Sequence, residues 1–270
     1  MEKGEFEVRR SWYVMFRIYK TLIAQSLEEN MTYRTTTVLT IIFGIAFYAI
    51  SIVAGGVYFS FAKTIYGWQF IDYLNLITTA NLISYMYQLF FVVSHEELTE
   101  TILQGNLDYS LLRPINSYWF HAFYRLDFPS TITVLLTVLV ESMILWSRQP
   151  TIQQLILYIL SVLLGVLFVF DINQIFVTAT FWFDGLTSLT GIPEDIMNAS
   201  ARPSKIYPSL VRMIFLWFVP SLAVTNLPVE IIQRNYSWGS FLWVVAIDLL
   251  LLRLSYIEWQ HGLRHYVSAD

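Results

Sequence analysis

Six apolar runs, each about as long as a membrane-crossing helix, constrain this chain more than any other feature. A bilayer's hydrocarbon core needs about 20 residues of α-helix, because each helical residue adds about 1.5 Å. Only helices and closed barrels satisfy every backbone hydrogen bond in lipid. We therefore predict an all-α integral membrane protein with six transmembrane helices, at about 36–59, 70–94, 120–146, 152–183, 206–225 and 238–258.

Composition supports the membrane class. Hydrophobic residues make up 56% of the chain and charged residues only 13%, against about 25% charged in soluble domains. A soluble fold of this size would lack the polar side chains to cover its surface. The net charge of −4 provides no basic field for nucleic acid, and with no cysteine there is no disulfide, thiolate metal site or Cys nucleophile. These values argue against a soluble enzyme or a nucleic-acid-binding domain.

The chain contains no repeat of 20 to 50 residues and no Pro-rich or Gly/Ser linker, so residues 1–270 are expected to form one transmembrane domain. Residues 10–30 place basic side chains at helical spacing beside aromatic ones, which predicts a helix lying in the membrane surface. The alternative is that they begin the first span. The fourth run has 32 residues, so it must tilt, protrude or break near Asp171, and a seventh partial crossing there is a second topology.

Basic residues predict the orientation, because Lys and Arg gather on the cytoplasmic side. Only Lys63, Arg148 and Arg234 fall outside if the N-terminus is inside. The links 95–119 and 184–205 are then cytoplasmic, and we expect a multi-pass protein of the bacterial plasma (inner) membrane with both termini cytoplasmic. Thirteen residues lie on the cytoplasmic side: Lys3, Arg9, Arg10, Arg17, Lys20, Arg34, Arg113, Arg125, Arg202, Lys205, Arg212, Arg253 and Arg264.

The stretch after the second run, 94–105, is predicted to be a separate short helix. It opens with a Ser-x-x-Glu capping box at Ser94 and closes on Gly105. Leu98 and Ile102 are one turn apart and give it a narrow apolar edge. The alternative interpretation is a solvated amphipathic connector. His95 and Glu96 have no second His four residues later, so the metalloprotease motif is absent.

Two short segments carry a family resemblance. The segment 105–114 reads GNLDYSLLRP, and the C-terminal segment 262–269 reads GLRHYVSA. They resemble the Gly-x-Leu-Asp-x-x-Leu-Leu-Arg-Pro and Gly-Leu-Arg-x-Tyr-x-Ser-Ala segments of one uncharacterised branch of permease subunits of ATP-binding-cassette (ABC) transporters of the second exporter type. The six spans, the N-terminal surface helix and the cytoplasmic ends extend this resemblance over essentially the whole chain.

The resemblance implies a pore-forming half-transporter that pairs with a second permease, identical or homologous. The helix at about 95–113 would be the coupling helix that seats in a cleft of a cytoplasmic ABC ATPase. No Gly-x-x-x-x-Gly-Lys-Ser/Thr motif occurs in the chain, so ATP and Mg²⁺ are expected on the partner, with no cofactor, metal or catalytic residue here. The coupling residues implied are Glu96, Glu97, Leu98, Glu100, Ile102, Asp108 and Arg113.

A polar stripe on the second run is the candidate translocation path. Thr78, Asn81, Tyr85 and Gln88 recur three or four residues apart, and the stripe continues toward Asn75. Such a stripe suits a water-filled cavity or a subunit interface. The resemblance favours a cavity, because the second and fifth spans of these permeases line the interface between them. The fifth run contains Pro220 and is followed by Pro228, which predicts a bent helix and a re-entrant external segment.

Three carboxylates fall inside the runs, where ionisable groups are costly and mark candidate functional positions. Glu141 lies near an outer end, so interfacial exposure is the expected explanation. Asp171 and Asp248 lie near mid-run, and the choice between helix packing and substrate contact stays open. His261 and His265 are one turn apart with no third ligand, and we expect them to be solvated.

The function expected is the permease of an ATP-driven ABC exporter, not itself an enzyme, with a second permease, ATPase subunits and membrane lipid as partners. Two alternatives belong to other classes. A membrane enzyme acting on lipid needs a clustered nucleophile, base or metal set, and a structural or assembly subunit needs only packing surfaces.

Overall fold

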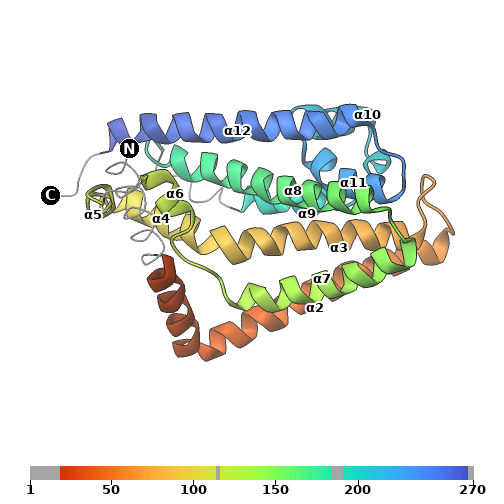
Figure 1. Ribbon diagram of the computed structural model, residues 1–270, viewed down its shortest axis with the longest axis horizontal. Helices are drawn as coiled ribbons and strands as arrows, with labels where there is room; N and C mark the ends of the chain where they lie inside the picture. Colours follow the sequence, from red (N-terminus) through yellow and green to blue (C-terminus); the bar gives the residue numbers. More distant parts are fainter. Residues whose placement is uncertain (1–18, 114–115, 184–190, 267–270) are drawn as a thin grey trace, which may run out of the picture.

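The computed structural model describes residues 19–113, 116–183 and 191–266 (Figure 1). These residues form an elongated bundle of helices without a named strand, which confirms the predicted all-α class. Among the described residues, five helical stretches are long and apolar enough to cross a membrane, and a helix pair bent by 85° makes six if the pair is counted as one span. They are α2 (Arg34–Phe61), the continuous stretch Phe70–Leu103, α7 (Pro129–Arg148), α8 (Ile152–Ala179), α12 (Trp238–His265), and the pair α10 (Ser209–Trp217) and α11 (Ser221–Ile232).

The second run differs from its prediction because it does not end before the expected coupling helix. The helix α3 (Phe70–Tyr87) passes through one π-helical segment, η1 (Gln88–Val92), directly into α4 (Val93–Leu103). The predicted capping box at Ser94 is wrong. The Ser94 hydroxyl instead donates to the Arg125 carbonyl and accepts from the Arg125 N–H, which leaves the helix free to continue.

The third run begins later than predicted. Its helix α7 begins at Pro129, whereas the prediction placed the start at residue 120. Residues before it form the separate short helix α6 (Ser117–Ala122), whose first N–H groups are capped by the Asn116 side chain. Proline fixes its own φ and lacks an N–H, so Pro129 suits a first helical turn and prevents α6 and α7 from merging.

The fourth run forms a single unbroken helix. The break considered near Asp171 is absent from α8, which runs 28 residues and begins with a capping box between Thr151 and Gln154. Several of its polar side chains bond along the helix or to neighbours: for example, the Asn173 amide donates to the Val169 carbonyl, whereas one oxygen of Asp171 has no hydrogen-bond partner among the described residues. Polar residues therefore mark contacts of α8 with its surroundings.

The fifth run is the largest departure from the predicted topology. After α8, the chain forms α9 (Ile192–Ser200) and η3 (Ser204–Ile206), which pack beside α11, so the predicted cytoplasmic link 184–205 is wrong where the structure describes it. The Ser200 hydroxyl donates to Ser221, and the Ser204 N–H donates to Asn226. Pro220 separates α10 from α11 at an angle of 85°, as the predicted bend required.

This path also changes the charge count. The charge of Lys205 acts on Glu230 of α11. The next residue, Ile231, accepts a hydrogen bond through its carbonyl from the Gln154 side chain in the first turn of α8. Lys205 therefore lies toward the end of the bundle that the prediction assigned to the outside. The prediction for Lys205 is wrong, yet the basic residues still favour the opposite end as cytoplasmic.

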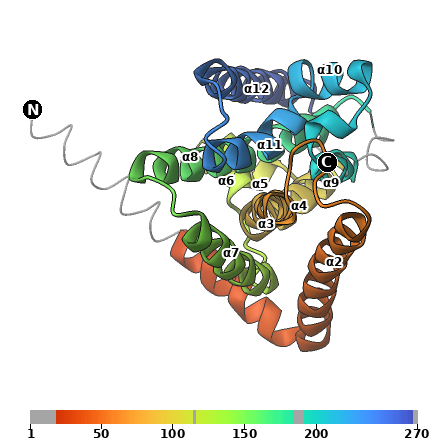
Figure 2. The same cartoon turned by 90° about the vertical axis from the view of Figure 1, so that its right-hand side faces the viewer.

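Residues 19–32 are helical and turn at Tyr33 into α2 (Figure 1). The first part of the predicted surface helix, 10–18, lies outside the described residues, as do the last three residues of the C-terminal segment, 267–269. Figure 2 looks along the bundle and shows α3 near its centre, between α2 and α7 on one side and α11 and α12 on the other.

Candidate functional site

The two segments that carry the family resemblance meet at one end of the bundle. The Tyr266 hydroxyl donates to the Gly105 carbonyl and accepts from the Leu107 N–H at 2.9 Å. Gly105 has φ +68°, a left-handed conformation that glycine adopts without strain, so the chain can turn sharply from α4 toward α5 (Asp108–Leu111). Tyr266 thus fixes the turn by bonding its backbone from the end of α12.

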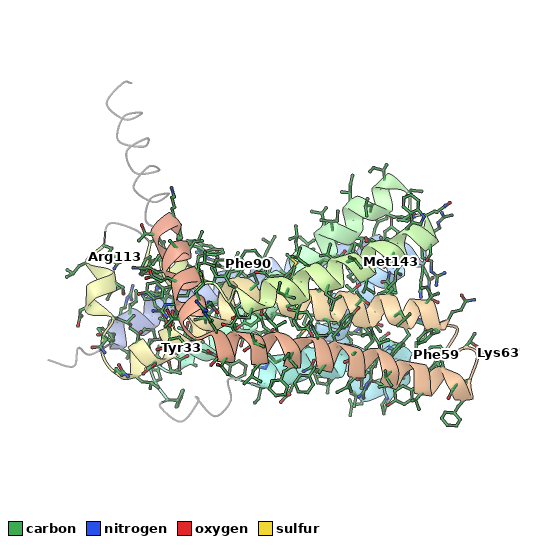
Figure 3. The ribbon with its side chains drawn as sticks, turned by 90° about the horizontal axis from the view of Figure 1, so that it is seen from below. Tyr33, Phe59, Lys63, Phe90, Arg113 and Met143 are labelled. Carbon is green, nitrogen blue, oxygen red and sulfur yellow. The ribbon has the colours of Figure 1, made fainter. Side chains whose placement is uncertain are left out.

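Close packing brings the end of α12 to this position. Gly262 lies so near the Phe181 ring that an added Cβ would come within 2.2 Å of it. The Trp259 side chain, fully buried, donates its N–H to the Ser117 hydroxyl at the start of α6. We call the assembly of α4, α5, α6 and the C-terminal end of α12 the tip. Figure 3 shows Arg113 of the tip and Lys63 at opposite ends of the molecule.

The predicted coupling residues differ in how far their side chains are exposed at the tip. Leu98 and Ile102 are buried inside the chain, because the apolar edge of α4 packs into the main core. They therefore do not form a surface for an ATPase in this conformation. Glu96, Glu100 and Arg113 are exposed, and Glu97 and Asp108 are half-buried.

Exposed apolar side chains of the tip were missed by sequence reasoning. Leu112 is 84% exposed, and Leu103 and Leu111 are 40% and 38% exposed. All three lie beside the turn that Tyr266 fixes. Leu111 and Leu112 belong to the 105–114 segment and Leu103 lies just before it. Only the fold shows that these three are exposed while Leu107 of the same segment is buried.

Arg125 connects the tip to the N-terminal helix. Its guanidinium pairs with Glu97 of α4 at 2.7 Å and with Glu29 at 2.6 Å. The link after α6 thus holds three segments together that are far apart in the sequence. Each partner is partly exposed, so each pair contributes on the order of 0.2–1 kcal/mol to stability.

A buried histidine braces α6 against the rest of the tip. The His121 ring bonds to the Ser110 hydroxyl at 2.9 Å through Nε2. Burial, with the nearby Arg113 charge as a second cause, lowers the pKa of His121 to about 4. The ring is therefore neutral near pH 7, and it serves the tip as a packed hydrogen-bonding group.

The predicted path residues are split between contact and exposure. The Thr78 hydroxyl bonds to Tyr48 of α2 at 2.9 Å, and the Tyr85 hydroxyl donates to the Gly44 carbonyl of α2 at 2.8 Å. These side chains hold α2 against α3, and Asn75 is likewise buried. Asn81 and Gln88 are half-buried, and only Gln88 among the predicted stripe residues lines the cavity of about 240 Å³ between α3, α4, α8 and α9.

The intramembrane carboxylates are all buried. Interfacial exposure was wrong for Glu141, which is 3% exposed and accepts from the Asn75 amide at 3.1 Å. Asp171 and Asp248 are fully buried between α8 and α12. Ser255 lies 3.5 Å from Asp171, whereas neither oxygen of Asp248 has a hydrogen-bond partner among the described residues.

Comparison with known proteins identifies the family. The family model described as ABC-2 family transporter protein matches residues 45–270, which include all the described membrane helices from α3 onward and most of α2. The chain belongs to the ABC-2 transporter family. No curated protein matches the chain at a significant level.

As an ABC-2 permease subunit, the chain is a multi-pass membrane protein with a transport function and no catalytic role of its own. The match covers both resemblance segments, 105–114 and 262–269, and the fold brings their described parts into contact through Tyr266 and Leu107. This contact gives a physical reason why two segments far apart in the sequence occur together in one permease. The signal that could have revealed it is the Tyr at 266, a long polar side chain whose phenol reaches backbone groups.

Proposed function

We propose that this ABC-2 permease is one of two permeases in an ATP-driven exporter, and that separate ATPase subunits bind at the tip. The observation that carries the proposal is the exposed apolar surface of Leu103, Leu111 and Leu112. Leu103 is the last residue of the stretch Phe70–Leu103, and Leu111 and Leu112 follow it, so we expect these side chains to lie outside the lipid tails. A protein partner with an apolar cleft would cover them, and clustered exposed apolar residues mark such interfaces.

The tip is well placed to transmit force into the bundle. Because α3, η1 and α4 are one continuous helix, a push on the tip would move the candidate path directly. Tyr266 joins the same tip to α12, and Arg125 joins it to the N-terminal helix. Closure of two ATPases on bound ATP would then rock the bundles against each other and open a path between them.

The proposed direction is outward from a bacterial cytoplasm, with ATP and Mg²⁺ held by the partner. The ATPase must reside where ATP is, and the positive-inside bias favours the tip as the cytoplasmic end. The half-buried polar side chains of Asn81 on α3 and Gln88 on η1 are candidates to face the second permease or the substrate.

The test is a charge at the most exposed tip residue. Leu112→Asp should reduce co-purification of the ATPase and transport-linked ATP hydrolysis about tenfold or more, since a desolvated charge in an apolar cleft is costly. Size-exclusion chromatography should show an unchanged, folded permease. Leu112→Met keeps the apolar surface and should behave as the wild type, and Tyr66→Asp places the same charge at the opposite end.

Equal ATPase binding by Leu112→Asp and wild type would overturn the proposed docking of the ATPase on these leucines. Direction is checked separately in inside-out vesicles, where an exporter accumulates substrate on addition of ATP. The chain has no native cysteine, so a single Cys at Asn106 should react with impermeant thiol reagents from the cytoplasmic side, and one at Gly67 from outside.

A further inference from the structure

The cavity beside Gln88 has the composition of a binding site. It measures about 240 Å³ and opens between α3, η1 and α4 on one side and α8 and α9 on the other. The π-helical segment η1 contributes part of its wall, and such segments are frequent at functional sites. Its described lining residues are Tyr87, Gln88, Val92, His95, Glu96, Thr99, Asn173, Phe176, Val177, Gly191 and Glu194.

Two carboxyl side chains line the cavity, and one of them holds an unsatisfied oxygen. Glu194, from α9, has one carboxylate oxygen that is buried and has no hydrogen-bond partner among the described residues. Glu96, from α4, is exposed at the rim. Burial is the main cause that raises the pKa of Glu194, and the charges of Asp195 and Glu96 add to it. No Lys or Arg is among the described residues that line the cavity.

The other walls are aromatic, apolar or neutral. Tyr87 and Phe176 contribute rings, and Val92 and Val177 contribute aliphatic surface. His95 does not neutralise the carboxylates by a direct bond, because its two ring nitrogens bond to Tyr87 and Gln174. A cavity with carboxylates on two elements and aromatic rings in its walls attracts a cation that also has an apolar surface.

We propose that this cavity binds the cationic head group of an amphipathic organic amine and forms the cytoplasmic entry site of the path. The volume suits a substituted ammonium group with an attached ring or short chain. Two carboxylates are among its described lining residues, whereas calcium takes six to eight oxygen ligands, so an organic cation fits these mixed walls better than a metal ion. Binding stands on the cavity alone, and the role in export rests on the proposed function.

The position of α9 explains why the cavity is on the path. Glu194 lies in the first turn of α9, and Ser200 at the end of the same helix bonds to Ser221 at the beginning of α11. A head group leaving the cavity along α3 would next meet the half-buried Asn81, which lies two turns from Gln88. The polar side of α3 and the beginning of α9 therefore form one continuous candidate route.

The experiment measures binding of benzyltrimethylammonium to the purified permease in a neutral maltoside detergent, by calorimetry or ligand-observed NMR. Glu194→Gln should weaken binding about tenfold or more, and Glu96→Gln less, because that carboxylate is more exposed. Asp195→Asn changes a neighbouring exposed carboxylate on α9 that does not line the cavity, and it should change binding far less than Glu194→Gln does. The matched anion benzylsulfonate should not bind.

A second measurement uses the wild-type protein and needs no variant to fold. Bound benzyltrimethylammonium should protect Glu194, but not Asp195, from carbodiimide modification read by mass spectrometry. Equal binding of the anion, unchanged binding in Glu194→Gln, absence of protection or displacement by stoichiometric Ca²⁺ would each overturn the proposal. If binding holds but ATP does not drive export of the cation, the failure lies in the proposed function.

Discussion

The helices α2 and α8 have the same length and similar hydropathy but opposite surroundings. Each has 28 residues, and the mean hydropathy of the most apolar 18-residue window is 2.3 in α2 and 2.7 in α8. Yet 11% of that window is buried in α2 and 56% in α8. Hydropathy alone therefore does not tell a central helix from a peripheral one when lipid is as apolar as the core.

What distinguishes the two helices is the set of residues that neighbours can contact closely. In α2 only Tyr48 and Gly55 are buried. In α8, Gly165 admits Ile83 of α3 and Val224 of α11, and the polar residues Asp171, Asn173 and Gln174 are all buried. Small residues and polar residues, rather than apolar ones, mark the buried faces of a membrane helix.

The largest expected effect comes from filling the close approach in α8. Gly165→Leu should destabilise the protein by about 3 kcal/mol or more, because even a Cβ there would come within 2.6 Å of Ile83. Gly56→Leu in α2 is the matched control, since no atom lies within 4 Å of an added Cβ. Thermal unfolding followed by size-exclusion measures both. Equal losses would mean that α2 is covered by a partner on the Gly56 side.

Polar residues provide an intermediate effect with a predicted change of sign. The Gln174 amide bonds to His95 and Thr178, each at 3.1 Å, so Gln174→Leu leaves buried groups unpaired and should cost about 1–3 kcal/mol. Asp248, which faces α8 from α12, has no partner for either oxygen among the described residues. Replacing it by the similarly sized Leu should keep or raise the melting temperature.

The Asp248→Leu variant also tests whether the Asp248 carboxylate has a partner from outside the described residues. A lower melting temperature in Asp248→Leu would show that this carboxylate has a partner supplied by a bound cation, water or the second permease. Preserved stability with lost transport would instead assign Asp248 to the moving parts of the path.

The comparison also explains how much the sequence could predict. Hydropathy was sufficient for the all-α class and for five of the six spans, because α2, α3, α7, α8 and α12 follow the apolar runs. It failed in the fifth, where α9 is too short and polar to be recognised as part of a membrane bundle. Its seat depends on bonds such as Ser200 to Ser221, which only three-dimensional contact reveals.

The candidate site shows the same limit. Tip residues 95–113 were found from a motif, but the motif did not tell which side chains point outward. Leu98 and Leu112 have identical chemistry, and the fold leaves the first 1% and the second 84% exposed. Glu194 was missed altogether, since a lone Glu after Pro193 carries no sequence signal until α4 is placed opposite it.

The smallest expected effect tests how α2 is held. The Tyr48 hydroxyl bonds to the buried Thr78 at 2.9 Å, and Tyr48 is one of the two buried residues of α2. Tyr48→Phe removes this bond while keeping the ring, and interhelical hydrogen bonds in membranes contribute about 0.6 kcal/mol on average. Tyr58→Phe, at a position 54% exposed, is the matched control and should have no effect. Thermal unfolding measures both variants. A loss well above 1 kcal/mol for Tyr48→Phe would mean that this one contact determines the docking of α2. The exposed face of α2 would then contribute little to docking, because lipid and protein cover apolar side chains equally well.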